Sequence, residues 1–393
     1  MKFFHTADWH LGKLVQGVYM TEDQRYVLNQ FIEAIEREKP DAVLIAGDLY
    51  DRAVPPTEAV DLLDELLERI VVDLHTPVLA ISGNHDSPDR LDFATRIMEG
   101  RGLHLVGQLR PEPKPVVLRD EHGEVHVHLV PYADPAQVRA LFADESIRSH
   151  DDAMKAIMSR IEAAMDRTAR HIFVGHAFVT PGGEPQANTS DSERPLSIGG
   201  AEHVSADHFK PFHYTALGHL HQAHYVLQEV IRYAGSPLKY SISEQSHNKC
   251  FYVVHMDGQG QVELERRELA PLRDMRRVTA TIEEIEKTHA RNEDYVFVTL
   301  TDEHPVLFPM EKVRNIYPNA LAVERRPLVQ AYGGAADGDE AQGAAAAGRR
   351  EADPVSLFAA FYAEVKGAPL GEEQRRLFAD TYEELLKEEK DAV

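Results

Sequence analysis

The sequence contains a single cysteine, Cys250, among its 393 residues. One cysteine cannot form an internal disulfide bond, and the lack of disulfide bonds is typical of proteins that work in a reducing compartment. No apolar run approaches the roughly 20 residues that a membrane-spanning helix needs. The N-terminus reads as a short strand that leads directly into polar residues, so we expect no signal peptide. These absences predict a soluble, cytoplasmic protein with no membrane partner.

Basic residues are also scarce, with 42 Lys and Arg against 65 Asp and Glu and a formal net charge of −23. Such a balance disfavours non-specific binding of nucleic acid by the chain as a whole. Part of the acidic excess would be offset if some carboxylates bind cations. A nucleic-acid substrate remains compatible with this charge if a partner supplies the basic surface. The dense basic run is Arg266, Arg267, Arg273, Arg276 and Arg277, which either contacts DNA phosphates or forms solvated surface.

Five apolar runs end directly in Asp, Asn or His. The central run is Ala42–Ala46, which is followed at once by Gly47 and Asp48. Parallel strands bring their carboxyl ends to one edge of a sheet, where ligand sites of α/β proteins form. Any one of these clusters could be an ordinary turn, but their repetition after apolar runs favours one shared site. The clustered residues are Asp8, His10, Asp48, Asp51, Asn84, His85, Asp86, His176, His219 and His221.

The donor atoms of these clusters predict a dinuclear metal centre. Carboxylate, amide and imidazole ligands together suit Mn, Fe or Zn better than Mg or Ca. Seven candidate ligands exceed the four that one tetrahedral ion needs, so we expect two ions that share a carboxylate. Two ions roughly 3.5–4 Å apart can activate water and stabilise a displacement at phosphorus. The sequence therefore predicts an enzyme that hydrolyses phosphoesters.

Residues 1–268 alternate between strand and helix patterns. They predict an α/β (α+β) fold, a four-layer sandwich of two mixed β-sheets flanked by helices. Within it, Thr21 and Gln24 match a capping box that opens a helix, and Asp151 or Asp152 is expected to begin another. His126 and His128 fall on the more polar face of a predicted hairpin strand and are expected to be solvated.

The remaining sequence predicts three smaller parts. Residues 269–330 read as a small α+β domain, and residues 331–353 read as a flexible, low-complexity linker. Residues 354–393 predict two amphipathic helices whose aromatic stripes need a partner surface. Such a pair either folds back on its own chain or docks on another protein in helix-in-groove fashion.

The motifs also carry a family resemblance. Asp8-x-His10, Gly47-Asp48-x-x-Asp51, Gly83-Asn84-His85-Asp86, Gly175-His176 and Gly218-His219-x-His221 resemble the five motifs of the calcineurin-like metallophosphoesterases. Three further segments resemble the SbcD family, the nuclease subunits of bacterial SbcCD complexes. They are residues 4–12, 194–200 and 233–238.

This resemblance implies a role for each site residue. Asp8, His10, Asp48 and His221 would bind one ion, and Asp48 would be shared with a second ion bound by Asn84, His176 and His219. Both would be divalent metal ions, most commonly Mn²⁺ in the family. His85 would act in catalysis by orienting the scissile phosphate or protonating the leaving oxygen. Asp51 stands where some relatives carry His, so a second catalytic imidazole is replaced here by a carboxylate that would support His10 or His85.

The resemblance also implies an assembly and a substrate. Residues 269–330 would cap the site, and the chain would form a homodimer within a heterotetramer. The C-terminal helices would dock on the coiled coil of an SbcC-type ATPase. The complex would act as an ATP-dependent exonuclease on double-stranded DNA and as an endonuclease on single strands and hairpins, in DNA repair, recombination and replication.

Two other functions use the same residues differently. A metallophosphatase or small-molecule phosphodiesterase would need the same dinuclear centre and would fit the acidic charge more simply. It would leave the tethered helices unexplained. An adaptor subunit would use only the helices, and the complete set of ligands argues against it.

Overall fold

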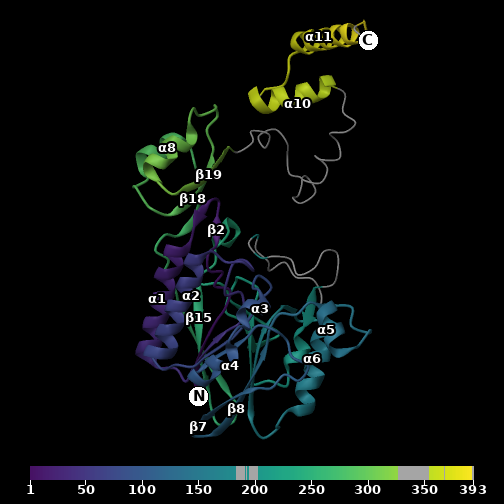
Figure 1. The fold of residues 1–393 in the computed structure, drawn as a ribbon. Coiled ribbons are helices and arrows are strands. Elements are labelled where there is room, and N and C mark those ends of the chain that lie inside the picture. Colours follow the sequence, from purple (N-terminus) through teal and green to yellow (C-terminus); the bar gives the residue numbers. More distant parts are fainter. Residues whose placement is uncertain (183–190, 192, 194–201, 326–353, 367, 392–393) are drawn as a thin grey trace. The chain divides into compact units, whose positions relative to one another are not determined.

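The computed structural model describes residues 1–182, 191, 193, 202–325, 354–366 and 368–391 (Figure 1). The segment 194–200 and the predicted linker 331–353 lie outside the described residues. The chain divides into two compact units, one of Met1–Arg277 with Glu293–Tyr295 and one of Val278–Asn292 with Val296–Val393. The predicted boundaries after residues 268, 330 and 353 stay predictions. Among the described helices, none is both long and apolar enough to cross a membrane.

The first unit contains two six-stranded mixed sheets. In spatial order, one sheet consists of β16 (Val262–Glu268), β15 (Cys250–Met256), β1 (Lys2–Thr6), β4 (Ala42–Ile45), β5 (Val78–Ile81) and β6 (Leu103–Val106). The other consists of β13 (His224–Val226), β14 (Gln228–Tyr233), β12 (Tyr214–Gly218), β9 (Arg170–His176), β8 (Gly123–Val130) and β7 (Val116–Asp120). Strands β1, β4 and β5 run parallel in the first sheet, and β9 and β12 run parallel in the second.

Helices cover the outer faces of both sheets (Figure 1). The first sheet packs on α1 (Thr21–Glu38) and α2 (Thr57–Glu68), and the second on α5 (Pro135–Phe142) and α6 (His150–Ala164). A separate apolar cluster, which includes Phe3, Leu44 and Val174, fills the space between the sheets. The result is four layers, helix, sheet, sheet and helix, and the predicted fold class is confirmed.

Shorter elements complete this unit. They are β2 (Leu14–Val15), β3 (Val18–Tyr19), β10 (Phe178–Thr180), β11 (His203–Ser205), α3 (Pro88–Leu91), α4 (Thr95–Met98), the 3₁₀ turns Glu99–Arg101, Ala206–Phe209 and Ile242–Glu244, and a π-helical turn at Arg69–Asp73.

Two predicted helix starts differ from the structure. Helix α1 begins at Thr21 as expected, but its N-cap is Met20 without a side-chain cap, and the predicted capping box is wrong. Gln24 is buried instead and donates to main-chain oxygens of the loop after β1. Helix α6 is capped by Ser149, whose hydroxyl accepts from the backbone N–H of Asp152. Asp152 is therefore the third residue of the helix, where it completes a capping box.

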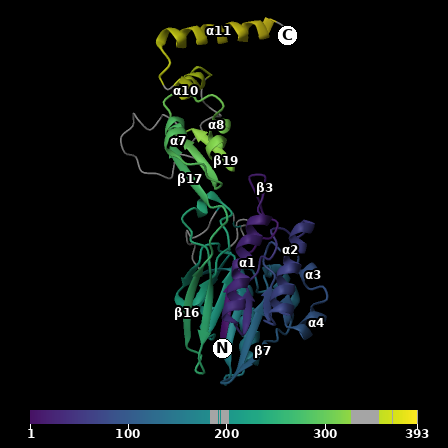
Figure 2. The ribbon, with the colours of Figure 1, turned by 90° about the vertical axis from the view of Figure 1, so that its left-hand side faces the viewer.

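The second unit is described by itself. Its sheet has the order β17 (Met275–Ala280), β18 (Tyr295–Leu300) and β19 (Ala320–Arg325), and its helices are α7 (Ile282–Thr288) and α8 (Pro309–Ile316) (Figure 2). Ile285, Val298 and Val313 belong to its own apolar core. Two further helices, α10 (Pro354–Lys366) and α11 (Glu372–Asp391), contact each other through the stacked rings of Phe358 and Phe378, whose centroids lie 4.0 Å apart.

The two hairpin histidines lie differently from the prediction. His128 is only 4 % exposed, and its Nε2 lies 3.0 Å from Nδ1 of the buried His171. His126 packs edge-on against the same His171 ring, at 5.3 Å between centroids. The expectation that His128 is solvated is wrong, because β9 lies beside β8 and places His171 against it. Burial lowers the pKa of His128 to about 3 and also lowers the pKa of His171.

We expect this histidine cluster to reduce stability in acid. Below about pH 6.5 the unfolded chain binds a proton at His128 that the folded chain does not accept until about pH 3, so the free energy of unfolding falls as the pH falls through that window. His128→Gln keeps a hydrogen-bonding side chain beside His171 but does not titrate. Denaturant unfolding at a series of pH values should show a pH dependence that is shallower by up to ~1.4 kcal/mol per pH unit. His122→Gln, at an exposed histidine, serves as the control, and equal slopes for His128→Gln and wild type would contradict the expectation.

Candidate metal centre

The loops that follow β1, β4 and β12 carry residues in a rare backbone conformation. Asp8, His10, Asp48 and His219 have φ values of 54°, 46°, 51° and 105°. Side chains other than glycine seldom adopt positive φ, and such strain gathers at functional sites, where the surrounding structure holds it. The chain therefore turns sharply where each of these three strands ends, and each turn carries one or two of the predicted ligands.

Glycines of the motifs let the loops at this edge approach one another closely, within one sheet at Gly83 and between the sheets at Gly218. A Cβ atom on Gly83 would lie 2.1 Å from Oδ1 of Asp48, and one on Gly218 would lie 1.9 Å from the main-chain oxygen of Ala46. These positions exclude any side chain. The carboxyl ends of strands from both sheets thus meet at one place.

Asp48 lies at the middle of the gathered side chains. Its Oδ2 is 3.6 Å from Nε2 of His10 and 3.4 Å from Nε2 of His176. Nδ1 of His176 lies 3.8 Å from Oδ1 of Asp8, and the ligand atoms of Asp8, Asp48 and His176 fall within one group that could hold a metal ion. One carboxylate therefore lies between imidazoles on two sides, as the prediction of a shared ligand requires.

The other predicted ligands complete the two sides. Nε2 of His221 is 3.0 Å from Nε2 of His10, and Oδ1 of Asn84 is 2.9 Å from Nε2 of His176. The His219 ring packs edge-on against His176, with 5.4 Å between the centroids. The structure thus brings all seven predicted ligands into one cluster, in which Asn84 is half-buried and the other six are buried.

The hydrogen bonds of the imidazoles show that this cluster fits cations. Nδ1 of His176 lies 2.9 Å from the main-chain oxygen of Ala46, and Nδ1 of His221 lies 3.1 Å from Oε1 of Glu244. Both oxygens accept, so each ring holds a hydrogen on Nδ1 and directs its Nε2 inward, where a metal ion can take the lone pair of that nitrogen in place of a proton. The two Nε2 atoms face Asp48, Asn84 and His10. A buried set of acceptors that face one another, with Oδ2 of Asp8 lacking a hydrogen-bond partner among the described residues, suits positive ions at its centre.

The charges of the cluster depend strongly on one another. Burial raises the pKa of Asp8 to about 7. Burial would also raise the pKa of Asp48, but His176 and His10 outweigh it and hold that pKa well below its usual range. Burial alone would lower the pKa of His176, yet Asp48 and Asp8 raise it to about 9. The site attracts positive charge, which protons or metal ions can supply.

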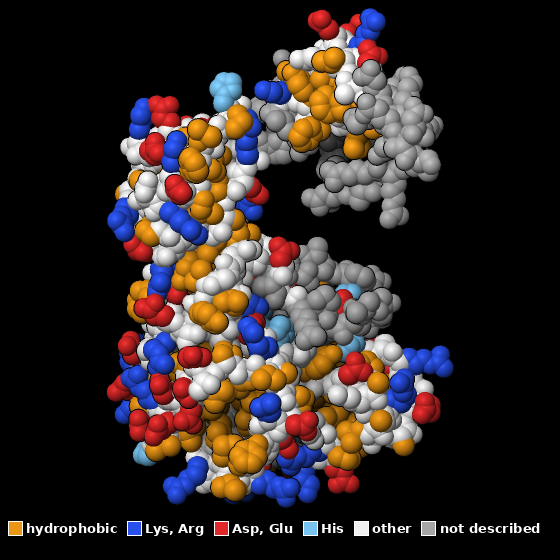
Figure 3. All heavy atoms as spheres, turned by 45° about the horizontal axis from the view of Figure 1, so that its top comes forward, with side chains coloured by type: hydrophobic (Ala, Val, Ile, Leu, Met, Phe, Trp, Pro, Cys, Tyr) orange, Lys and Arg blue, Asp and Glu red, His pale blue; other side chains and the backbone are white. Residues whose placement is uncertain are grey.

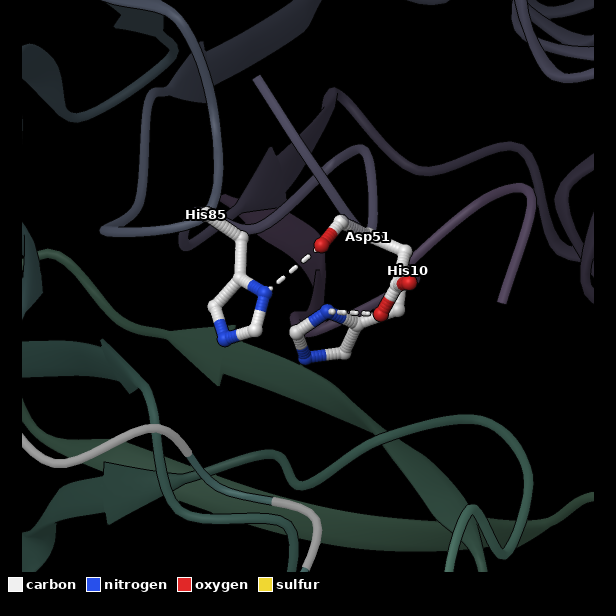
Figure 4. A group of neighbouring side chains, drawn as sticks. All are labelled: His10, Asp51 and His85. Atoms are coloured by element: carbon white, nitrogen blue, oxygen red, sulfur yellow. Dashed lines mark hydrogen bonds and ion pairs between the residues drawn. The ribbon is translucent and has the colours of Figure 1, made fainter. Parts of the chain in front are cut away.

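His85 and Asp51 lie beside His10 (Figure 4). The backbone N–H of His85 donates to Oδ1 of Asp48 at 2.9 Å, and its Nδ1 donates to the main-chain oxygen of Asp51 at 2.8 Å. The Asp51 carboxylate lies 2.8 Å from Nζ of Lys13 but 3.9 Å from Nδ1 of His10. Asp51 therefore supports His85 through its main chain, while its side chain is held by Lys13.

The sequence analysis assigned no supporting role in the site to several residues that have one. The Asp86 carboxylate accepts from the backbone N–H groups of Leu49, Tyr50 and Gly83, and so ties the loop after β4 to the loop after β5. Its place in the Gly83–Asp86 motif was a signal for such a role.

Gln24 and Tyr240 hold the loop after β1. Nε2 of Gln24 donates to the oxygens of Trp9 and His10 and to the Tyr240 hydroxyl, and that hydroxyl donates to the oxygen of Trp9. The sequence signal for this role of Gln24 was an amide side chain within a predicted helix, which the structure shows to be buried. Glu244, which contacts His221, stands in a stretch without a recognisable pattern.

Comparison with known proteins agrees with this architecture. Residues 1–223 match the family described as calcineurin-like phosphoesterase, and residues 271–366 match the type 5 capsule protein repressor C-terminal domain. The SbcD subunit of nuclease SbcCD from Staphylococcus epidermidis is 36% identical over 326 residues, which cover 82% of this chain and 85% of that protein. The protein of the same name from Staphylococcus saprophyticus is 35% identical, over 82% of this chain and 84% of its own length. The chain therefore belongs to the calcineurin-like phosphoesterases, as a metal-dependent phosphodiesterase of the SbcD family.

Proposed function

We propose that the chain is the nuclease subunit of an SbcCD-type complex and that it cleaves DNA at a centre of two Mn²⁺ ions. The observation that carries the proposal is the set of inward-facing acceptors at the meeting edge of the two sheets. Relatives named as nuclease subunits, which align with 82% of the chain, support the choice of DNA as substrate.

The proposed ligands divide into two sets that share Asp48. Asp8, His10, Asp48 and His221 hold one ion, and Asp48, Asn84, His176 and His219 hold the other. The 3.6 and 3.4 Å distances from Oδ2 of Asp48 to His10 and His176 support its place in both sets. A mixture of oxygen and imidazole donors without thiolate suits Mn²⁺.

The residues around the ions prepare the reaction. When bound, two divalent ions supply a hydroxide nucleophile and neutralise the charge that develops at phosphorus. His85 is half-buried, so its ring is accessible to a substrate. Because Nδ1 of His85 donates to Asp51, its Nε2 is the atom that, when protonated, can donate to a phosphate oxygen. The bond from the His85 backbone to Asp48 fixes this ring relative to the shared ligand.

Manganese-dependent cleavage of labelled single-stranded DNA tests the proposal. We expect Asp48→Ala to lose both ions and all cleavage, because both ligand sets need this carboxylate. We expect His85→Ala to keep both ions but to cleave at least about 100-fold more slowly, as is common when a group that acts on the transition state is removed. His122→Ala, at an exposed histidine far along the chain, is the control. Normal turnover by His85→Ala would refute its role.

The same assay distinguishes the proposed nuclease from the alternative function, a metallophosphatase or small-molecule phosphodiesterase. A small-molecule phosphodiesterase would hydrolyse a chromogenic phosphodiester efficiently and leave the DNA intact. That result would remove the nuclease proposal while keeping the metal centre.

We propose a smaller role for Asp51 than for His85. The contact of Asp51 with His85 uses a main-chain oxygen, which a substitution retains, so we expect Asp51→Ala to lower DNA cleavage by less than about tenfold. His85→Ala, measured in parallel, should lose far more. Equal losses in the two variants would show that the carboxylate itself takes part in catalysis.

A partner would supply the charge that holds the DNA. Within the described residues, Arg267 pairs with Glu265, Arg273 with Asp23, and Arg276 with Asp294, and acidic and basic side chains are interspersed over the face seen in Figure 3. Three of the five arginines of the basic run are thus paired with the chain's own carboxylates.

We therefore infer that an SbcC-type ATPase provides the DNA-binding surface and makes double-strand exonuclease action ATP-dependent. Cleavage of single strands and hairpins is the endonuclease part of the same proposal. Helices α10 and α11 are the proposed docking segment, since Phe361 and Leu377 expose 59 % and 69 % of their surface.

The proposed homodimer within the heterotetramer would use the surface at α3 and α4. Phe93 and Ile97 are each 79 % exposed there, and exposed apolar groups that lie together commonly mark an interface. We expect the double variant Phe93→Gln with Ile97→Gln to halve the mass measured by light scattering during size exclusion. Val117→Gln, at an exposed position on the edge strand β7, is the control. An unchanged mass for the double variant would place the interface elsewhere.

A further inference from the structure

A buried ion pair lies behind the proposed ligand His221. Glu244, at the end of the 3₁₀ turn Ile242–Glu244, is 0 % exposed, and Lys249, directly before β15, is 7 % exposed. One carboxylate oxygen of Glu244 accepts from Nδ1 of His221, and the other accepts from Nζ of Lys249. Nζ of Lys249 also donates to the main-chain oxygen of His221 at 2.9 Å and to Oγ of Ser236 at 2.8 Å.

Stability alone is a poor explanation for this arrangement. Taking two charges out of water is costly, and well-packed apolar residues of similar size are often at least as stabilising. Lys249 has three ammonium hydrogens and three partners here, so its geometry is fully determined. Both members of the pair contact His221, one through the ring and the other through the main chain. The arrangement is therefore built around that one histidine.

The pair also connects the two sides of the centre. His221 follows β12 of one sheet, whereas Lys249 leads into β15 of the other sheet, which also contains β1, the strand before His10. Holding His221 from this side fixes its Nε2 at 3.0 Å from Nε2 of His10. By contrast, Nδ1 of the proposed ligand His176 contacts a main-chain oxygen, that of Ala46, rather than a buried ion pair.

We propose that Glu244 and Lys249 are positioning residues that present Nε2 of His221 to a divalent cation. Glu244 selects the tautomer with hydrogen on Nδ1, and Lys249 holds both the carboxylate and the backbone of His221. This inference depends on the proposed role of His221 as a metal ligand.

Two double variants of the full-length chain isolate the contact. Removing one charge would leave the other buried without a partner of opposite charge, so both residues are replaced together. Glu244→Gln with Lys249→Met keeps an oxygen that can accept from Nδ1, whereas Glu244→Leu with Lys249→Met has none. Mn²⁺ affinity is measured by isothermal titration calorimetry at one pH, and thermal melting is measured without metal.

The expected result is a difference between these two variants. The variant with Gln should bind both ions more tightly than the variant with Leu, which should bind one of the two ions about 10–100-fold more weakly than the wild type, as is typical when such a supporting group is lost. Both should melt at similar temperatures without metal. Equal affinities in the two variants would overturn the inference, even if both melt below the wild type, because the pair would then only stabilise the fold.

A spectroscopic measurement decides the question without substitution of the pair. In wild-type chain labelled with ¹⁵N-histidine and free of metal, the ring nitrogen shifts of His221, assigned with His221→Gln, should report hydrogen on Nδ1. Hydrogen on Nε2 with none on Nδ1 would overturn the inference whether or not either double variant folds. Failure of the wild type to bind Mn²⁺ would instead overturn the proposed function, so the two failures are distinguishable.

Discussion

The structure depends on the close approach of the loop after β4 to the ends of β9 and β12. The main-chain oxygen of Ala46 accepts from Nδ1 of His176, and a Cβ atom on Gly47 would lie 2.4 Å from that nitrogen. This contact joins the two sheets at their carboxyl edges. It places Asp48 among imidazoles that come from both sheets, and neither sheet alone could assemble the set. Side chains at Gly47 or Gly218 would separate the sheets and the ligands with them.

The strained turns at this edge are held by backbone hydrogen bonds. Each residue in a sparsely populated conformation costs about 1–3 kcal/mol, and Asp8, His10 and Asp48 are three such residues in two neighbouring loops. The loop after β1 lies beside the loop after β4. Its backbone N–H groups at Asp8, His10 and Leu11 donate to the main-chain oxygens of Gly47, Asp48 and Leu49, in that order. Gln24 and Asp86 add side-chain bonds to the same main chains. The ligands are thus held by a network that exists before any metal or substrate arrives, which reduces the ordering cost of binding.

Sequence reasoning succeeded where the signal was local and failed where it was tertiary. The run Ala42–Ala46 is a buried strand that delivers Asp48, because an apolar run followed by glycine and a carboxylate carries its meaning within a few residues. Gln24 was misread because a capping box is also a local pattern, and only the packing of α1 against the loop after β1 reveals its other use.

His128 is a second case in which tertiary packing, which the sequence pattern does not show, decides the environment of a residue. Alternation along a strand gives two faces but does not say what covers each one, and here the neighbouring strand supplies His171. Glu244 and Lys249 could not be found at all, since their partner His221 is more than twenty residues away and no spacing rule relates them.

The acidity of the chain can be understood in the same physical terms. The carboxylates of Asp8 and Asp48 are 0 % and 2 % exposed, and bound cations would neutralise them locally, so they contribute little to the field that an approaching molecule meets. The excess of 65 acidic over 42 basic residues must therefore lie mainly on the surface, where it repels a polyanion. Three arginines of the basic run, Arg267, Arg273 and Arg276, are already paired with carboxylates of the chain. A centre that attracts positive ions lies inside an acidic surface, so under the proposed function the cleavage of a phosphodiester and the capture of its polymer are separate tasks, and we infer that a second subunit brings the DNA to the centre.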